Sequence, residues 1–360
     1  APEFTVADSL SAARISSFVR PFDPDDPVVP RALLVRTGTE RHELHVDLPH
    51  VVFDGVSLQL LVGELLDRYA GTEPVAPRVS YAHAAQWYHD RLVAGERGTA
   101  EAYWRKRFGG VRPPLALPTD RPRGPRRAVR GAVTRRKLGP DWRHRIASAA
   151  RQHHTTEFVV LLTAYHATLA RLTGQRAVAV GCPASGRTHP DVEAVIGMFV
   201  STICLAVDTP PDRTLAGLVA EVDEHARQAL TYQDYPFEQL VQRLDLAAEP
   251  GRNPLFDAFF AWQNIDFYEF SRGGLDVRVD LVNPGTTRFD LNLQAYQRPD
   301  WLVLDLEYAT ELFNRASADY VLDQYVVVLT ELLANPEIPV HPAAPVIERL
   351  PASSHHDFDF

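Results

Sequence analysis

The sequence predicts an α/β fold of the sandwich type, built in two lobes. Strand-like segments, with apolar side chains at every second residue, alternate irregularly with helix-like segments of period 3.6. A stretch rich in proline and arginine, residues 113–136, separates two such series and marks a boundary between lobes. The sequence carries no glycine-rich phosphate loop, which argues against a doubly wound dinucleotide-binding fold. We therefore expect an N-terminal lobe over residues 1–111 and a C-terminal lobe over residues 112–360.

The N-terminal lobe shows strand patterns followed by helix patterns. Apolar residues fill 32–35, and residues 44–48 alternate between apolar and polar side chains, as in a half-buried strand. Ser57 can cap the helix that the leucine spacing predicts over about 58–70, and a second helix is expected over about 81–98. A loop therefore lies between the second strand and the first helix.

The C-terminal lobe continues the alternation with longer elements. Helices are expected over about 155–172, 213–230 and 314–334, and a further helix begins at Pro236, where proline suits the first turn. Strands are expected near 177–181, 255–262, 275–282, 289–297 and 301–308.

Composition excludes several classes of protein. A formal net charge of −9 disfavours nucleic-acid binding. No apolar run approaches the length of a membrane span, and no signal peptide opens the sequence. The low cysteine content fits a reducing cytoplasm, where we expect the protein. The two cysteines, Cys182 and Cys204, form neither a disulfide framework nor a metal cluster, and both are expected to be small buried side chains.

The loop between strand and helix carries the first candidate site. His50 follows the strand, Asp54 comes four residues later, and Gly55 is next. A loop exposes an imidazole while the flanking elements hold it in place, which suits a general base. The alternative is an ordinary surface or core histidine, because the chain contains fourteen histidines.

A second candidate lies after the buried strand at 177–181. Glycines and a proline mark a turn over residues 181–186, and Arg187 leaves this turn with a guanidinium available for pairing. The alternative is a solvated loop arginine.

Residues 48–57 resemble the His-His-x-x-x-Asp-Gly signature of the condensation domains of nonribosomal peptide synthetases. These domains belong to the chloramphenicol-acetyltransferase-like acyltransferase superfamily. His50 matches the second histidine of the signature, Asp54 the aspartate and Gly55 the glycine, whereas Pro49 replaces the first histidine.

Further segments resemble motifs of the same family, in the family's order, over about residues 18–340. Ser201 replaces an asparagine in the motif that spans 196–202. The other matching segments are residues 81–87, 117–123, 232–238 and 252–257.

The resemblance implies two chloramphenicol-acetyltransferase-like lobes in a V shape with a tunnel between them. A carrier-bound acyl or peptidyl thioester enters one mouth and an amine acceptor the other. His50 takes the proton of the amine or orients it, and a backbone N–H near Gly55 stabilises the oxyanion. Ser201 and Trp262 line the substrate tunnel.

The resemblance also implies a buried, bidentate ion pair between Asp54 and Arg187 that joins the two lobes. It implies neither a metal nor an intrinsic cofactor, because the phosphopantetheine arms belong to the partner carrier proteins, donor and acceptor. Eight basic residues between Arg121 and Lys137 are then either a solvated linker or a surface that attracts an acidic carrier. The implied role is in secondary metabolism of the kind that makes peptide antibiotics.

In this family the histidine signature lies well inside the first lobe, whereas here it begins at residue 49. We therefore expect an incomplete first lobe, from a shortened, split or degenerate domain. A sheet without its neighbours exposes an edge and an apolar face, so a companion N-terminal fragment or a tight oligomer is expected to cover it. Two other functions remain open: a free-standing ester or amide synthase of the same fold, and a non-catalytic carrier-recruiting domain.

Overall fold

The computed structural model divides into two compact units, which we describe one at a time. Unit 1 contains residues 1–89, 187–200 and 271–276, and unit 2 contains residues 90–186, 201–270 and 277–360. The structure describes residues 3–9, 17–23, 30–94, 98–110, 113–244, 246, 249–263, 269–298 and 300–341.

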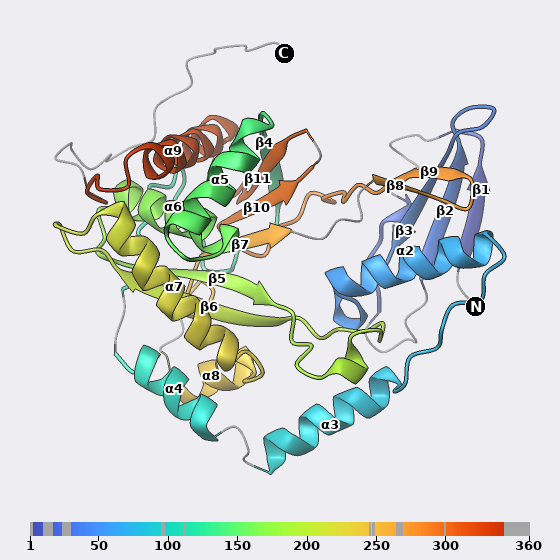
Figure 1. Cartoon of the computed structure of the whole chain (residues 1–360), viewed down its shortest axis with the longest axis horizontal. Helices are drawn as coiled ribbons and strands as arrows, with labels where there is room; N and C mark the ends of the chain where they lie inside the picture. The colour runs from blue at the N-terminus through green and yellow to red at the C-terminus, as the bar shows by residue number, and fades with distance from the viewer. Residues whose placement is uncertain are drawn as a thin grey trace. The chain divides into compact units, whose positions relative to one another are not determined.

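Unit 1 contains a three-stranded sheet in the order β1-β2-β3 (Figure 1). The strands are β1 (Glu3–Ala7), β2 (Arg31–Arg36) and β3 (His42–Asp47), with β1 parallel and β3 antiparallel to β2. One face buries Ala7, Leu33 and Val35. Strand β1 was not predicted, because five residues give too short an alternation to detect.

The helical part of unit 1 begins directly after the histidine loop. A short 3₁₀ helix, η1 (His50–Val52), precedes α2 (Gly55–Tyr69), and α3 (Tyr81–Val93) crosses into unit 2 at Asp90. Ser57 was expected to cap α2, but Asp54 is the N-cap, and its side chain accepts a hydrogen bond from the Ser57 N–H at 2.8 Å. Aspartate and serine both suit this role, so their sequence could not decide between them.

The second helix expected over 81–98 is two helices, α3 and α4 (Gly98–Phe108). Residues 95–97 of the expected helix lie outside the described residues.

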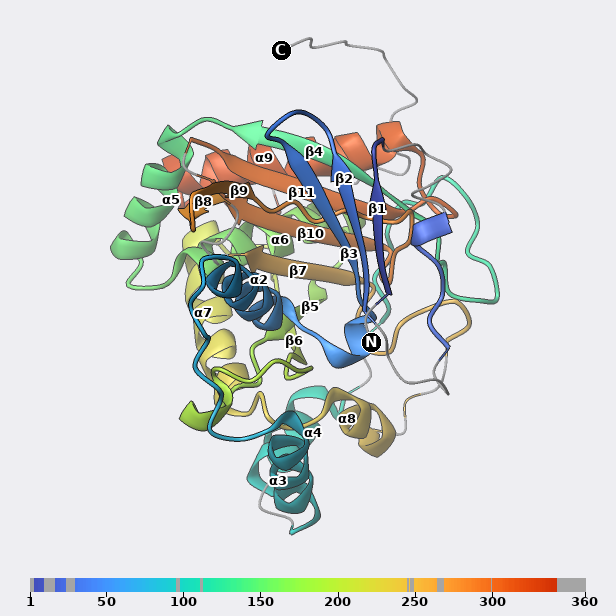
Figure 2. The ribbon, with the colours of Figure 1, turned by 90° about the vertical axis from the view of Figure 1, so that its right-hand side faces the viewer.

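Unit 2 is built on a six-stranded sheet in the order β4-β11-β10-β7-β5-β6, which Figure 2 shows in face view. Strand β7 is parallel to both of its neighbours, β10 and β5. Strand β11 is antiparallel to β10, β4 is antiparallel to β11, and β6 is antiparallel to β5. The strands are β4 (Gly131–Leu138), β5 (Ala177–Ala184), β6 (Ser201–Asp208), β7 (Ala258–Gln263), β10 (Leu291–Gln297) and β11 (Leu302–Ala309). Strands β8 (Glu269–Arg272) and β9 (Leu275–Arg278) form a hairpin, and its central residues 271–276 belong to unit 1.

The helices of unit 2 bury its core against this sheet. Helix α6 (Glu157–Thr173) is apolar on nearly every side, with thirteen buried residues, so it is the central helix of the unit. It packs against β5, α7 and α9. The other helices are α5 (Asp141–Gln152), α7 (Leu215–Thr231), α8 (Phe237–Leu244) and α9 (Arg315–Ala334).

The compact units differ from the expected lobes, 1–111 and 112–360, in two ways. The chain passes from the first unit to the second at Asp90, because α4 packs with α8 rather than with the first sheet. Residues 187–200 also belong to unit 1, although they follow the first strands and helices of unit 2 in the sequence.

The basic stretch Arg121–Lys137 is mostly neither a linker nor a free cationic surface. Most of its second half is strand β4, and four of its arginines pair with acidic residues far away in the sequence. Arg135 donates to both oxygens of Asp305, each at 2.6 Å. Arg123 pairs with Asp290, and Arg136 pairs with Asp319 and Asp323.

Candidate active site

The His50 side chain is exposed at the start of η1, directly after Pro49, which is the N-cap of that short helix. Pro49 has an extended conformation, with φ −73° and ψ 131°, which proline's fixed φ favours. Among the residues that the structure describes, no side chain forms an ion pair or hydrogen bond with the imidazole. The ring is therefore available to a ligand.

Asp54 is buried four residues later, with 3% of its surface exposed. Its carboxylate accepts hydrogen bonds from the N–H of Ser57 at 2.8 Å and from the N–H of Phe199 at 3.0 Å. Burial by itself raises the pKa of this carboxyl, but these hydrogen bonds and the positive charge of Arg187 outweigh it, and the pKa is lowered. Asp54 is therefore an ionised structural group.

Arg187 supplies the positive charge beside Asp54. Its Nη2 lies 3.1 Å from Oδ1 and 3.3 Å from Oδ2 of that carboxylate, and the guanidinium carbon lies 4.3 Å from the centroid of the Phe199 ring. Its Nη1 donates to the carbonyl oxygens of Val192 at 2.5 Å and Val195 at 2.7 Å. The guanidinium thus ties the helix cap to the carbonyls of residues 192–195.

The structure contains the expected Asp54–Arg187 pair but differs from the prediction in two details. Both oxygens of Asp54 are contacted by the same nitrogen, Nη2, because Nη1 is used by backbone carbonyls. The pair was expected to join the two lobes, but both residues belong to unit 1. The reason is that residues 187–200 fold with the first unit.

Ser57 completes the cluster and was predicted only as a helix cap. Its hydroxyl donates to the Gly197 carbonyl at 2.7 Å and accepts from the Gly197 N–H at 2.9 Å and from Arg187 Nη2 at 3.1 Å. Gly197 must be glycine, because a Cβ there would lie 2.1 Å from the ring of Tyr81. We call Asp54, Ser57, Arg187 and Gly197 the loop clamp.

The start of α2 provides hydrogen-bond donors close to His50 in the sequence. The first N–H groups of a helix have no acceptor within the helix. The Ser57 N–H donates to the Asp54 carboxylate. Gly55 and Val56 precede Ser57 in the first turn, and their N–H groups do not donate to that carboxylate. Gly55 is exposed and Val56 is partly exposed, so the positive end of the helix dipole lies near the surface of unit 1.

The two expected tunnel residues lie in unit 2. Ser201 is the first residue of β6, pairs with Ala184, and has a buried hydroxyl without a hydrogen-bond partner among the described residues. Trp262 is a partly buried residue of β7 and lines a cavity of about 580 Å³. Ser201 does not line that cavity.

A second buried acid lies in unit 2, where the sequence gave no indication of it. Asp257 is 2% exposed and pairs with Arg252, and its Oδ1 has no hydrogen-bond partner among the described residues. Burial and the nearby carboxylate of Asp290 raise the pKa of Asp257 to about 6, against the opposing charges of Arg252 and Arg123. The signal that could have revealed it is the five-residue spacing of Arg252 and Asp257 around a tight turn.

Neither a metal-ligand cluster nor a membrane-spanning helix is present among the described residues. No group of three or more His, Cys, Asp or Glu side chains is placed to hold a metal ion. Within the described part of the chain, no helix has the length and apolarity to cross a membrane. Cys182 and Cys204 are both buried, and neither forms a disulfide bond within the described residues.

An exposed histidine, the helix N-terminus that follows it and the loop clamp that caps this helix form a site suited to acyl transfer. The chain belongs to the Condensation domain family, whose model matches residues 3–344. This match confirms the prediction of a condensation domain.

Curated relatives agree with this assignment. Tyrocidine synthase 3 of Brevibacillus parabrevis is 34% identical over 338 residues, which are 94% of this chain and 5% of that protein. Surfactin synthase subunit 1 of Bacillus subtilis (strain 168) is 33% identical over 347 residues, 96% of this chain and 10% of that protein. The chain therefore spans a small part of the length of these relatives.

Solved structures share the fold. One is a four-domain nonribosomal peptide synthetase bound to AMP and glycine, with a TM-score of 0.84 and 20% identity, over 94% of this chain and 28% of that one. Another is the X-domain from teicoplanin biosynthesis, with a TM-score of 0.82 and 21% identity, over 94% of this chain and 80% of that one. The expected α/β condensation-domain fold is thus confirmed.

Proposed function

We propose that this domain forms an amide bond between a carrier-bound acyl or peptidyl thioester and an amine acceptor. The observation that carries this proposal is His50, an exposed imidazole held directly before a helix N-terminus by a buried cluster. Family membership and relatives named as peptide synthases support it.

The chemistry needs a base and an anion site. The amine nitrogen attacks the thioester carbonyl, a C–N bond forms, and the carbonyl oxygen becomes an oxyanion. In our proposal His50 takes the proton of the amine or orients it, and the N–H groups of Gly55 and Val56 stabilise the oxyanion. The C–S bond then breaks, and the departing thiolate receives the proton.

The clamp has a positioning role in this proposal. Asp54 accepts two backbone N–H bonds and the Arg187 guanidinium, so it fixes the start of α2 without reaching the substrate. Pro49 stiffens the other side of His50. Small errors in the position of a catalytic group are costly, so a rigid cap supports the rate.

The partners in this proposal are donor and acceptor carrier proteins. Their phosphopantetheine arms bring the thioesters, so the domain uses no cofactor of its own. Ser201 and Trp262 are proposed to line the substrate's path. The product class is that of peptide antibiotics and related secondary metabolites.

The second candidate is ester or amide synthesis with a free acceptor, since an exposed imidazole can also act as a general base toward an attacking hydroxyl. The third is carrier recruitment without turnover, which would not need an exposed histidine.

The test is product formation by the whole chain with carrier-bound acyl thioester as donor. A carrier-bound amine, a free amine and a free alcohol are compared as acceptors, with intact-protein mass spectrometry as the readout. Amide from the carrier-bound amine supports the proposal, whereas ester or free amide alone supports the second candidate. Carrier binding without product from any acceptor supports recruitment. His42→Ala changes another exposed histidine of unit 1 and is the matched control for His50→Ala.

The three-stranded sheet supports the expectation of a companion fragment or a tight oligomer. The face opposite the buried one carries exposed apolar side chains, with Phe4 at 59% and Val6 at 62% exposure on β1 and with Leu44 and Val46 on the same face of β3. Such a face is costly in water. Light scattering after size exclusion should detect a dimer or a bound fragment, and a lone monomer at micromolar concentration would refute this expectation.

A further inference from the structure

The cavity that Trp262 lines lies where the parallel strands of unit 2 end. Its wall includes Ala184, the last residue of β5, and Gln297, the last residue of β10. Glu157 and Phe158, at the start of α6, form another side. In open α/β sheets, ligands bind outside the carboxyl ends of parallel strands, and this cavity lies at such ends.

The wall of this cavity is mostly apolar. Trp262 and Phe158 are only partly buried, and Leu230 of α7 is 42% exposed, so large apolar side chains border solvent here. Among the described residues that line it, Glu157 is the one charged residue, and none is a cation. A volume of about 580 Å³ lies within the range of small-molecule sites, about 300–1,000 Å³.

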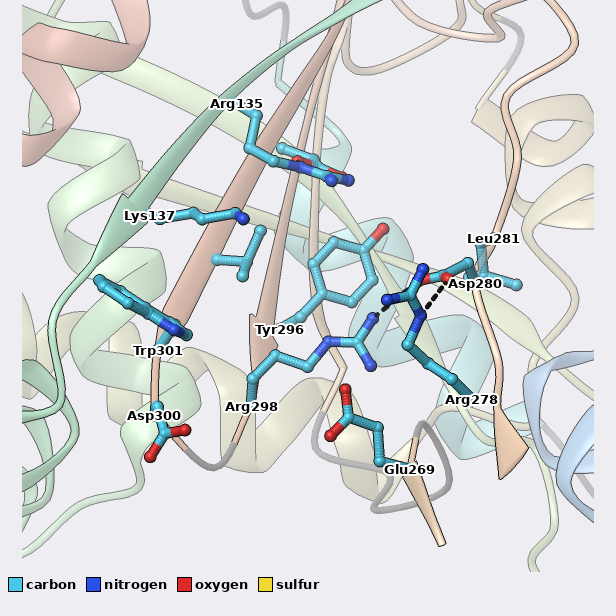
Figure 3. A pocket seen from close by; sticks show the side chains of 12 residues that line it. Arg135, Lys137, Glu269, Arg278, Asp280, Leu281, Tyr296, Arg298, Asp300 and Trp301 are labelled. Atoms are coloured by element: carbon cyan, nitrogen blue, oxygen red, sulfur yellow. Dashed lines mark hydrogen bonds and ion pairs between the residues drawn. The ribbon is translucent and has the colours of Figure 1, made fainter. Parts of the chain in front are cut away.

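A second cavity of unit 2, of about 370 Å³, has the opposite character (Figure 3). Its described lining includes four cations, of which Arg135, Arg278 and Arg298 pair with acids of the same cavity. Arg278 Nε lies 2.8 Å from Asp280, Arg298 lies 3.5 Å from the same carboxylate, and Arg135 pairs with Asp305. Its charges compensate one another, so it offers no apolar surface comparable to that around Trp262.

We propose that the cavity around Trp262 binds the apolar side chain of an aminoacyl or acyl substrate. This inference rests on the proposed function for the identity of the substrate, but the site is defined by its own lining. An apolar side chain gains from burial against Trp262, Phe158 and Leu230, whereas an anionic one is repelled by Glu157. The cavity thus selects substrates by apolar size.

Leu230→Trp tests the inference with little risk to the fold, because Leu230 is exposed and the larger side chain fills the cavity from its rim. The control is Val327→Trp, at an exposed position of α9 (46%) that does not line the cavity. The probes are N-acetylcysteamine thioesters of phenylalanine and of glycine, with ligand-observed NMR as the binding readout. Phenylalanine with a free amine represents an acceptor, and N-acetylphenylalanine represents a donor.

We expect the wild type and Val327→Trp to bind at least one phenylalanine thioester, and Leu230→Trp to bind it about 10-fold more weakly or worse. Binding of the glycine thioester should not change. The arm that responds, free amine or N-acetyl, identifies the source of the side chain. Equal binding of phenylalanine by the wild type and Leu230→Trp, or no preference for phenylalanine over glycine, would overturn the inference.

Binding needs no turnover, so the inference and the proposed function fail separately. If the wild type prefers the phenylalanine thioester to the glycine thioester but makes no product, the binding role of the cavity is supported and the proposed function is refuted. If product forms but no variant distinguishes phenylalanine from glycine, the proposed function is supported and the binding role of the cavity is refuted.

Discussion

The two units each bury an aspartate beside an arginine, with opposite effects on the acid. Asp54 in unit 1 accepts two backbone N–H groups as well as Arg187, and its pKa is lowered. Asp257 in unit 2 pairs with Arg252 but has an unpaired Oδ1 among the described residues and a second carboxylate, Asp290, nearby, and its pKa is raised to about 6. An ion pair with arginine therefore does not by itself determine the charge state of a buried aspartate.

The difference lies in the backbone donors. Two N–H groups aimed at one carboxylate favour the charged form, whereas desolvation with an incomplete set of partners favours the neutral form. The cluster behind His50 is thus built to stay charged and rigid at all ordinary pH values. The Asp257 cluster can release or take up a proton near pH 6.

The largest expected effect is that of Arg187→Ala, which leaves a buried carboxylate without its counter-charge. We expect a loss of about 3–5 kcal/mol in the free energy of unfolding, measured by urea denaturation, together with loss of condensation activity. Arg252→Ala is the comparison. The loss in unfolding free energy caused by Arg252→Ala should be smaller at pH 5 than at pH 8, because Asp257 can become neutral at the lower pH. An equal loss at both pH values would contradict the difference between the two aspartates.

Asp257→Asn should remove a pH dependence of stability. The folded-state pKa, about 6, lies above the ordinary value, so the folded state holds the proton more tightly. The proton on Asp257 therefore adds about 3 kcal/mol to the free energy of unfolding below about pH 4, and this amount is lost as the pH rises through 6. The free energy of unfolding of Asp257→Asn, relative to that of the wild type, should therefore rise by about 3 kcal/mol between pH 4 and pH 7. A constant difference across this range would contradict the raised pKa.

Ser57→Ala should have the smallest effect of the three. The change leaves the N–H and carbonyl of Gly197 without their partner, at a cost of about 1–3 kcal/mol in unfolding free energy. Thr330→Ala is the control, because this hydroxyl bonds to Val326 at an exposed position and its loss should cost less than about 0.5 kcal/mol. Equal effects of the two substitutions would show that Ser57 is not part of the clamp.

The sequence predicted the parts of the site that are local. His50, Asp54 and Gly55 lie within six residues, and their alternation of strand, loop and helix is a short-range pattern. The role of Arg187 came from the family resemblance, because a pair separated by 133 residues leaves no periodic signal. Ser57 was recognised only as a capping residue, since its three hydrogen bonds depend on how residues 187–200 fold.

The parts that were missed depend on distant pairs. The basic stretch was interpreted as a linker or a carrier surface, but Arg135 lies beside Asp305 only because β4 pairs with β11. The raised pKa of Asp257 likewise depends on Asp290, which the strand β10 brings close. Local patterns identify elements, whereas the charge state of a buried group depends on contacts that the tertiary fold creates.

The most direct test of the account is a single-turnover rate for His50→Ala, with its unfolding free energy measured in the same buffer. Since His50 is exposed and outside the clamp, we expect the rate of amide formation to fall by about 10²–10⁴-fold while stability changes by less than about 0.5 kcal/mol. A wild-type rate in this variant, at unchanged stability, would contradict the central claim that His50 carries the chemistry.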